Sequence, residues 1–540
     1  MALLQPQERK KFWLLTAFNT FISLADIASL ALLLLVVNLY ANTGVSGRLL
    51  PAWMRDSHSL LPVLTCLIFF SLKNLGGYIV YKMQTAYVHR VAARISENQL
   101  VQYLNGCYAD YVSVDTSVRI HRINHEPIEF AQYVLSGIQQ ILAELSLTLV
   151  AVAAILLYNA RLFALLTVFL VPPVLLVSYL VKRKLRVVRK QVKSDSEKTT
   201  QYLQESLGAF VESNIYNKKA FFTARHSRYQ RQLNSHLSAL HVTHWLPSKV
   251  IEVFAVVGLF ILILVNKYGG GAADIVSLGA FMAAAYKIIP GIVRMVNFAA
   301  QVRTFEYTVR DLQPVLPEAN KQQAADAIDT IAFQNISFAH NDKEVLKDIS
   351  LEFNKGDFAD IVAPSGKGKT TLLNLLLGFL SPSSGEITVN GKRVDAAALQ
   401  QYWPRIAYVK QQTFLIYDSI RNNITLEENT TNEQRLAAAI RNAGLTDFVN
   451  AQDGGLEENI TDGGKNISGG QRKRIALARA LYKDADVIIL DEPFSELDET
   501  SERQLLEHFR QLAQQGKIVV LITHNRISES FCNKTVLLYG

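Results

Sequence analysis

A small-residue loop at residues 363–371 has the composition of a phosphate-binding loop. A short apolar strand that includes Ile361 runs into the loop, and a Leu-rich helix begins beyond it. Main-chain N–H groups at such a helix start attract phosphate. Lys369 would reach the β- and γ-phosphates of a nucleotide, and the Thr370 hydroxyl would hold Mg²⁺. The residues expected to bind nucleotide here are Pro364, Ser365, Gly366, Lys367, Gly368, Lys369, Thr370 and Thr371.

Two further patterns lie downstream of this loop. The apolar run 487–490 ends in Asp491 and Glu492, which suits a Mg²⁺-directing aspartate followed by a water-activating glutamate. A strand that simply ends in acidic residues is the alternative. Residues 468–471 read Ser-Gly-Gly-Gln before an Arg- and Ala-rich helix, which makes a second anion-binding helix start. Each pattern is common alone, so their order decides the interpretation.

That order resembles the nucleotide-binding domain of ABC transporters over roughly residues 330–540. The resemblance implies ATP and Mg²⁺ as cofactors, with Lys369 and Thr370 in the Walker A loop. It implies a signature motif made of Ser468, Gly469, Gly470 and Gln471. The catalytic residues that it implies are Glu492 as base, His524 as switch histidine, Gln411 of the Q-loop and Asp498 of the D-loop. The metal ligands that it implies are Thr370, Gln411 and Asp491.

The sequence departs from the family pattern at several positions. Ala363 replaces the first glycine of the loop, and alanine disfavours positive φ. His340 stands where an aromatic ring usually stacks on adenine, so it is the expected base-binding residue with a smaller face. Lys367 adds charge inside the loop, and Asp360 occupies a strand position that is usually apolar. The glutamate, the histidine and the signature are intact, so we expect hydrolysis.

The family also implies how two copies cooperate. The signature of one subunit closes over ATP held by the Walker A loop of the other. The expected partner is therefore a second half-transporter, in a homodimer or a heterodimer, and ATP binding should favour dimerisation.

The N-terminal part of the chain has the composition of a membrane domain. The 540 residues are 49% apolar and 19% charged, with a net charge of +8 and a mean hydropathy of +0.14. The excess of positive charge fits basic cytoplasmic loops better than nucleic-acid binding, because the chain also contains long uncharged runs that are typical of membrane spans. Six apolar spans reach or exceed the length needed to cross a bilayer. They lie near 12–41, 59–82, 128–157, 161–182, 246–266 and 275–300.

The loops between these spans set the orientation. Residues 83–127 and 184–245 carry most of the basic residues, which places both loops, the N-terminus and the C-terminal domain in the cytoplasm. Their apolar residues recur at helical spacing, so we expect helices that extend beyond the bilayer. Six spans, two long cytoplasmic extensions and a C-terminal ATPase resemble the exporter-type half-transporters of this family. That resemblance implies a short helix in each extension, near Tyr108–Ser117 and Gln204–Asn214.

Ionisable residues inside the spans allow two interpretations. They are Asp26, Glu144, Glu252, Lys287 and Arg294. Lys287 and Arg294 share one helical face, with Pro290 between them, and could line a cavity for an anionic cargo. Alternatively, they pair with Glu144 or Glu252, or extend to the membrane interface. The pattern also bears a weak similarity to lipid-linked oligosaccharide flippases.

The sequence therefore predicts a multidomain protein, with an all-α six-helix transmembrane domain followed by an α/β P-loop ATPase. The boundaries are 1–312, a linker at 313–328 and 329–540. The predicted function is an ATP-hydrolysing exporter subunit in the plasma (inner) membrane that moves a lipid, glycolipid or other amphipathic, anionic cargo by alternating access. A peptide or small-molecule exporter and a membrane-anchored regulatory ATPase are the alternatives. Membrane lipids are expected partners, and nucleic acid is not.

Overall fold

The computed structural model describes residues 2–40, 59–106, 108–158, 160–268, 275–313, 326–340, 343–364, 366–428 and 432–538. The chain forms two compact units. One comprises Met1–Gly106 and Val112–Pro317, and the other comprises Cys107–Tyr111 and Glu318–Gly540. Most of the predicted linker, residues 314–325, lies outside the described residues.

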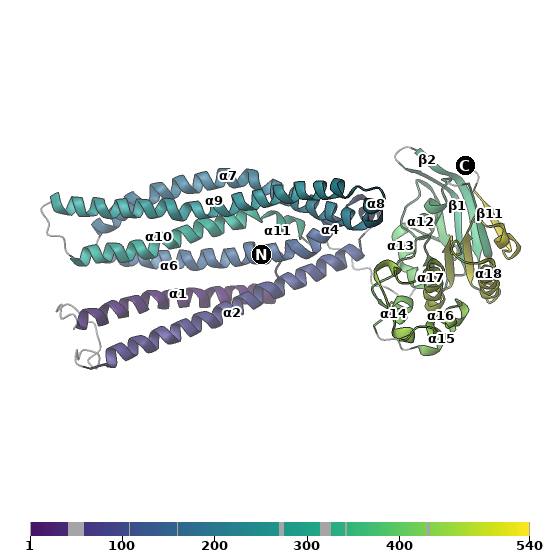
Figure 1. Ribbon diagram of the computed structural model, residues 1–540, viewed down its shortest axis with the longest axis horizontal. Helices are drawn as coiled ribbons and strands as arrows, with labels where there is room; N and C mark the ends of the chain where they lie inside the picture. Colours follow the sequence, from purple (N-terminus) through teal and green to yellow (C-terminus); the bar gives the residue numbers. More distant parts are fainter. Residues whose placement is uncertain are drawn as a thin grey trace. The chain divides into compact units, whose positions relative to one another are not determined.

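The first unit consists of helices (Figure 1). The long ones are α1 (Pro6–Tyr40), α2 (Leu61–Leu104), α6 (Ser136–Tyr158), α7 (Ala160–Gly208), α9 (Lys219–Tyr268) and α10 (Ile275–Thr304). The short ones are α4 (Thr116–Ile120), η2 (His121–His125), α5 (Glu126–Glu129), η3 (Phe130–Leu135), α8 (Phe210–Ile215) and α11 (Tyr307–Asp311), and the short helix α3 (Tyr108–Ser113) is divided between the two units at Tyr111. Helix α7 packs beside α9, α10 beside α6, and α1 beside α2 and α6 (Figure 1).

The lengths of these helices exceed what a bilayer requires. Helices α2, α7 and α9 have 44, 49 and 50 residues. At 1.5 Å per residue they are about 66–75 Å long, against about 30 Å of hydrocarbon. Each predicted apolar span overlaps one of the long helical stretches. Within the described residues, three stretches are long and apolar enough to cross a membrane, namely Pro6–Ser29, Leu61–Leu104 and Thr116–Ala153.

The short helices of the first unit differ in part from the prediction. Helix α3 occupies the first expected position, Tyr108–Ser117, and ends at Ser113. At the second expected position, Gln204–Asn214, α7 continues to Gly208 and the short helix is α8. The Tyr108 ring, which belongs to the second unit, stacks on Phe379 with centroids 4.8 Å apart.

A polar cluster holds the last helix of the first unit. Lys193 on α7 donates to Glu126 of α5 at 3.1 Å and also to Asp311 of α11. The Tyr307 hydroxyl of α11 donates to Glu129 at 2.6 Å. Helix α11 is therefore tied to α5 and α7 at the point where the chain leaves the helical unit.

The second unit contains a five-stranded parallel sheet in the order β11-β3-β10-β9-β6. Its strands are β3 (Phe358–Val362), β6 (Ile406–Val409), β9 (Val487–Asp491), β10 (Ile518–Ile522) and β11 (Lys534–Leu537). A four-stranded antiparallel sheet has the order β2-β1-β4-β5. It comprises β1 (Thr330–His340), β2 (Lys343–Asn354), β4 (Ser384–Val389) and β5 (Lys392–Val394). A small pair joins β7 (Asp418–Ser419) to β8 (Asn459–Ile460).

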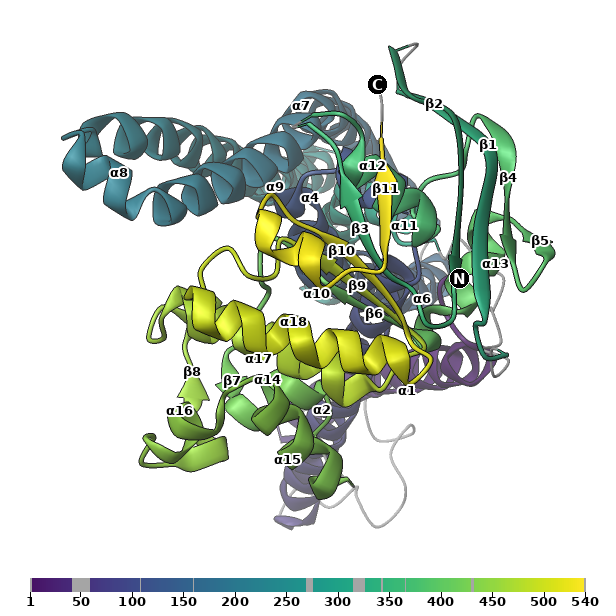
Figure 2. The ribbon, with the colours of Figure 1, turned by 90° about the vertical axis from the view of Figure 1, so that its right-hand side faces the viewer.

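Helices cover the two faces of the parallel sheet (Figure 2). Helices α17 (Gly469–Lys483) and α18 (Glu499–Gln514) pack on one face, and α12 (Lys369–Leu376) packs on the other. Helices α14 (Ile420–Thr425) and α15 (Glu433–Asn442) pack against α17, and α13 (Ala396–Gln401) lies beside β5. Helix α16 (Thr446–Asn450) follows α15. The apolar side chains of β9 and β10 are buried on both faces, which is typical of a central parallel strand. Since parallel strands end at one edge, the loops after β3, β6, β9 and β10 meet there.

Candidate functional site

The phosphate loop connects β3 to α12. Gly368 caps α12 with φ +89°, and a Cβ there would lie 2.7 Å from Leu346 Cδ2, so only glycine fits. Gly366 has φ +78°, and a Cβ built on it would meet no atom within 4 Å. The loop therefore leaves open space beside its main chain. Ala363 is buried and is not among the residues with positive φ, so the alanine causes no backbone strain.

Four side chains from four strand ends form one continuous chain of contacts. Lys369 Nζ donates to the Ala363 carbonyl at 2.9 Å and lies 3.1 Å from His524 Nε2. His524 Nε2 is 3.3 Å from Glu492 Oε1. Gln411 Nε2 donates to Glu492 Oε2 at 2.8 Å. The structure thus brings together Lys369, Gln411, Glu492 and His524, which the sequence separates by up to 155 positions.

His524 Nε2 lies between one group that only donates hydrogen bonds and one group that only accepts them. Lys369 offers only donors, so toward Lys369 the ring nitrogen must accept. The Glu492 carboxylate offers only acceptors, so toward Glu492 the same nitrogen must carry a proton. The position of one proton therefore decides which partner His524 holds.

The main chain turns sharply at Glu492. Its φ is +45°, a left-handed conformation that costs a non-glycine residue about 1–3 kcal/mol. The Glu492 N–H donates to the Ile522 carbonyl at 2.9 Å, which holds the residue against β10. The strand β9 ends one residue earlier, at Asp491. Strain of this kind commonly marks a functional position.

Asp491 lies in a different environment from Glu492. The Tyr408 hydroxyl donates to Asp491 Oδ2 at 3.4 Å. Burial raises the pKa of Asp491, and the Glu492 charge adds to this rise. Burial also raises the pKa of Tyr408, with Asp491 as the next cause. A half-buried carboxylate whose charge is unfavourable gains from a cation beside it.

The signature residues begin α17. Ser468 caps the helix in a capping box, since its Oγ accepts from Gln471 N at 3.3 Å while Gln471 Oε1 accepts from Ser468 N at 2.8 Å. Both glycines lie against the segment after β9. A Cβ on Gly469 would lie 1.5 Å from Glu496 Oε2, and one on Gly470 would lie 3.0 Å from the Glu496 carbonyl oxygen. At Gly470 the close atom belongs to the main chain, so packing within this chain favours glycine there, whereas at Gly469 the Glu496 side chain could move aside.

The remaining predicted residues lie outside the four-residue chain of contacts. Asp498 caps α18 and accepts from Ser501 N at 3.0 Å and from Ser501 Oγ at 2.6 Å. Pro364, Lys367 and Thr370 are exposed and Thr371 is half-buried. His340 is exposed at the end of β1, opposite Lys343. Ser365 lies outside the described residues.

These residues fit a nucleotide with a bound cation. The open space beside Gly366 can take phosphate oxygens next to main-chain N–H groups, with Lys369 adjacent. Asp491 would hold the cation with the Thr370 hydroxyl and the Gln411 amide oxygen. Magnesium keeps several waters and needs only a few protein oxygens, so three such ligands suit it.

Comparison with known proteins agrees with this geometry. Residues 346–495 match the family model described as ABC transporter. Over these residues the chain is an ABC transporter domain. Its fold is that of a bacterial Atm1-family ABC exporter with ATP bound, with a TM-score of 0.79 over 99% of this chain and 93% of that one at 17% identity. The transporter is an integral membrane protein whose ATP hydrolysis is coupled to transport.

Two curated relatives are described as ATP-dependent lipid A-core flippase. The protein from Cupriavidus metallidurans is 28% identical over 417 residues, which cover 75% of the transporter and 70% of the relative. The protein from Burkholderia pseudomallei is 27% identical over 477 residues, which cover 82% and 80%.

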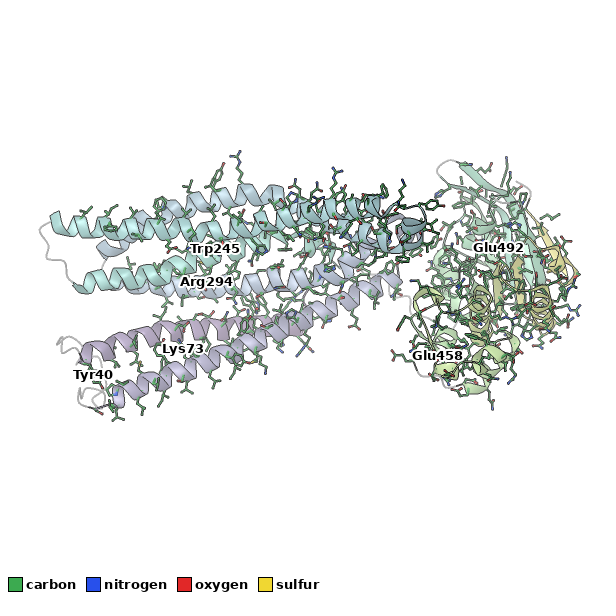
Figure 3. The ribbon with its side chains drawn as sticks, viewed as in Figure 1. Tyr40, Lys73, Trp245, Arg294, Glu458 and Glu492 are labelled. Atoms are coloured by element: carbon green, nitrogen blue, oxygen red, sulfur yellow. The ribbon has the colours of Figure 1, made fainter. Side chains whose placement is uncertain are left out.

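Charges inside the helical unit of the transporter are paired. Arg294 on α10 donates to both carboxylate oxygens of Glu144 on α6, at 2.5 and 3.1 Å (Figure 3). Lys73 on α2 lies 2.6 Å from Asp26 on α1. Glu252 lies 3.3 Å from Lys249. For Arg294 the pairing interpretation therefore holds in this structure. The side chain of Lys287, the other residue of the predicted basic stripe, lies outside the described residues.

Sequence reasoning missed a buried lysine next to the site. Lys473 on α17 is 2% exposed. It precedes the buried residues Ala476, Leu477 and Ala480 by three, four and seven positions, which places it on the apolar face of its helix. That spacing is the signal that could have identified it.

Asp360, noted as unusual in the sequence, is buried in β3. Its Oδ1 has no hydrogen-bond partner. The pKa of Asp360 rises to about 6, chiefly through burial and also through the Glu529 charge, while the Ser528 hydroxyl and Lys369 oppose the rise.

Proposed function

We propose that this chain is one half of a dimeric, ATP-driven exporter that moves a lipid or another amphipathic, anionic cargo across the inner membrane. The boundaries 1–312, 313–328 and 329–540 remain our proposal for the membrane domain, linker and ATPase domain. The observation that carries the ATPase half is the contact chain from Lys369 through His524 and Glu492 to Gln411. These groups come from four adjacent strand ends of one sheet.

In this proposal each residue has a defined task. Lys369 and the main chain of the loop bind the β- and γ-phosphates, and bound Mg²⁺ neutralises phosphate charge. Glu492 accepts the proton of the attacking water, and its contacts with Gln411 and His524 orient it. Ser468, Gly469, Gly470 and Gln471 bind the ATP held by the partner subunit. His340 stacks on the base, and Asp498 supports the dimer contact next to the signature.

The lipid cargo is favoured by the two flippase relatives and by the helical unit itself. Long helices such as α2 expose many apolar side chains, Leu64, Leu67, Leu72 and Tyr78 among them. Such faces suit a hydrocarbon environment. The basic loops 83–127 and 184–245 favour a cytoplasmic location for the N-terminus and the ATPase. A peptide or small-molecule cargo is the alternative within this class.

Reconstitution into lipid vesicles tests the proposal. We expect ATPase activity that anionic lipids or glycolipids stimulate, together with ATP-dependent movement of a labelled lipid between leaflets. Glu492→Gln should retain ATP binding and lower hydrolysis by about 100-fold or more, because the general base is lost. The matched control is Glu499→Gln on α18, where the carboxylate pairs with Arg503 of the same helix at 2.9 Å.

The same variant separates a transporter from a membrane-anchored regulatory ATPase. A transporter loses cargo movement with Glu492→Gln, whereas a regulator that works by ATP binding keeps its output. Hydrolysis by the purified chain without movement of any lipid, glycolipid or peptide would reject the transport half of the proposal.

A further inference from the structure

Lys473 connects the signature helix to the catalytic residues of the same chain. Its ammonium group donates to the main-chain carbonyl of Gln411 and, at 3.2 Å, to that of Glu492. The side chains of these two residues are also bonded to each other, from Gln411 Nε2 to Glu492 Oε2 at 2.8 Å. The Q-loop and the loop after β9 are thus held together twice, once through side chains and once through Lys473.

The contact at Glu492 supports a strained main chain. The left-handed φ of +45° turns the chain away from the sheet, so its carbonyl cannot continue the β9 ladder. Lys473 Nζ and Ser495 Oγ, the latter at 3.3 Å, both donate to that carbonyl. A charge-assisted hydrogen bond is stronger than a neutral one, so the lysine favours this turn and with it the place of the Glu492 carboxylate.

Burial of the Lys473 ammonium group costs desolvation free energy, so its position indicates a specific role. Desolvation lowers the pKa of Lys473, while the charges of Glu496, Asp491 and Glu492 oppose this. An apolar residue would fill the same position in the α17 face without losing hydration. The ammonium offers what an apolar residue lacks, which is donors directed at two loops.

We infer that Lys473 is a positioning residue that couples the signature end of α17 to Glu492 and Gln411 of its own chain. The inference rests on the proposed function, in which Ser468–Gln471 bind the partner's ATP and Glu492 acts on the ATP of this chain. Lys473 lies five residues after Ser468 on one helix, and Ile475, Leu477 and Ala478 of that helix are fully buried in the core. A shift of the helix start on closure over the partner's ATP therefore reaches Glu492 through the ammonium group.

The same helix supplies a matched control. Lys483, at the other end of α17, donates to the main-chain carbonyls of Trp403 at 2.7 Å and Ile406 at 2.6 Å. It makes the same kind of contact, two carbonyls from one ammonium, away from the catalytic residues. Replacement of either lysine removes two contacts to main-chain carbonyls, and the variants differ in location and in burial, since Lys473 is buried and Lys483 is exposed.

The test compares the full-length reconstituted transporter with Lys473→Met, Lys473→Arg and Lys483→Met. Three quantities are measured: kcat and KM for MgATP with its Hill coefficient, ATP affinity by equilibrium binding in EDTA, and the midpoint of thermal unfolding. We expect Lys473→Met to lower kcat at least about tenfold, to keep ATP affinity within about threefold, and to bring the Hill coefficient to 1. Lys473→Arg should restore kcat to within about threefold, and Lys483→Met should match the wild type.

Several results would overturn the inference. Lys473→Met with wild-type kcat and Hill coefficient would remove the positioning role. Equal losses in Lys473→Met and Lys483→Met, with parallel falls in unfolding midpoint, would show a structural role only. A Hill coefficient of 1 in the wild type would reject the inferred coupling between the two ATP sites. If Lys473→Met does not fold, Lys473→Gln replaces it with the same expectation. Absence of hydrolysis by the wild type would instead reject the proposed function.

Discussion

The Gln411 amide nitrogen donates to the Glu492 carboxylate across 2.8 Å, although 81 positions separate the two residues in the chain. An amide group offers donors at nitrogen and acceptor sites at oxygen. Gln411 can therefore hold the glutamate through nitrogen while its oxygen is left for a cation. This arrangement joins the proposed general base to the proposed metal site through one side chain.

Lys369→Ala should weaken nucleotide binding at least about tenfold, because a charge-assisted bond to phosphate contributes about 1.5–3 kcal/mol. Equilibrium titration with a fluorescent ATP analogue measures the change. Lys347→Ala is the control, since that lysine on β2 is exposed and pairs with Glu344 at 3.8 Å. Unchanged affinity in Lys369→Ala would mean that the loop does not bind phosphate.

Ser468→Ala should lower ATPase activity by more than its effect on stability explains. Loss of an N-cap costs about 1 kcal/mol. Ser419→Ala removes the comparable cap of α14, where the hydroxyl accepts from Asn422 N at 3.1 Å. Both variants should lower the unfolding midpoint similarly, and only Ser468→Ala should lose activity. Equal activity in the two would argue that Ser468 acts only as a cap.

Asp360→Asn should stabilise the transporter at neutral pH and not at pH 4. The pKa of Asp360 rises from its ordinary value of 3.8 to about 6 in the fold. Between these values the native state binds more protons than the unfolded state, so wild-type stability falls as pH rises through this window. Above pH 6 the Asp360 carboxylate is ionised in the native state, and its buried charge lowers the free energy of unfolding to the full extent.

Thermal unfolding of the full-length chain in detergent between pH 4 and 8 checks this prediction. We expect the midpoint of Asp360→Asn to exceed that of the wild type by about 2–6 °C at pH 7–8, with partial solvent screening taken into account. The difference should vanish as the pH falls to 4. A constant difference across the range would exclude titration of Asp360 as its cause.

The Arg294–Glu144 pair should be tested by a double-mutant cycle. Arg294→Ala leaves Glu144 without its partner and should lower cargo-stimulated ATPase activity, while basal turnover persists. If pairing is the only role of Arg294, the double variant with Glu144→Gln regains stimulation. If Arg294 binds an anionic cargo, the double variant stays unstimulated. Stimulation unchanged in Arg294→Ala would exclude both roles.

The sequence predicted those parts of the site that follow directly from strand and loop order. Lys369, Gln411, Glu492 and His524 each follow a short apolar strand, and parallel strands end at one edge. The contacts of Lys473 were not predictable in this way, because main-chain carbonyls carry no residue signature.

The pairing of Arg294 with Glu144 was one of two interpretations that the sequence left open. Glu144 and Arg294 are 150 positions apart, and only the packing of α6 against α10 brings them together. The second short helix was predicted to start at Gln204 and starts at Phe210, because helical periodicity runs without interruption through residues 204–208, where α7 continues.

The left-handed main chain at Glu492 has a consequence for engineering. Glycine adopts this conformation without penalty, so Glu492→Gly would relieve the strain and also abolish turnover. A laboratory search that rewards heat resistance alone would thus tend to discard the carboxylate. Mutant libraries intended to raise thermal stability should therefore keep Glu492 and vary other positions.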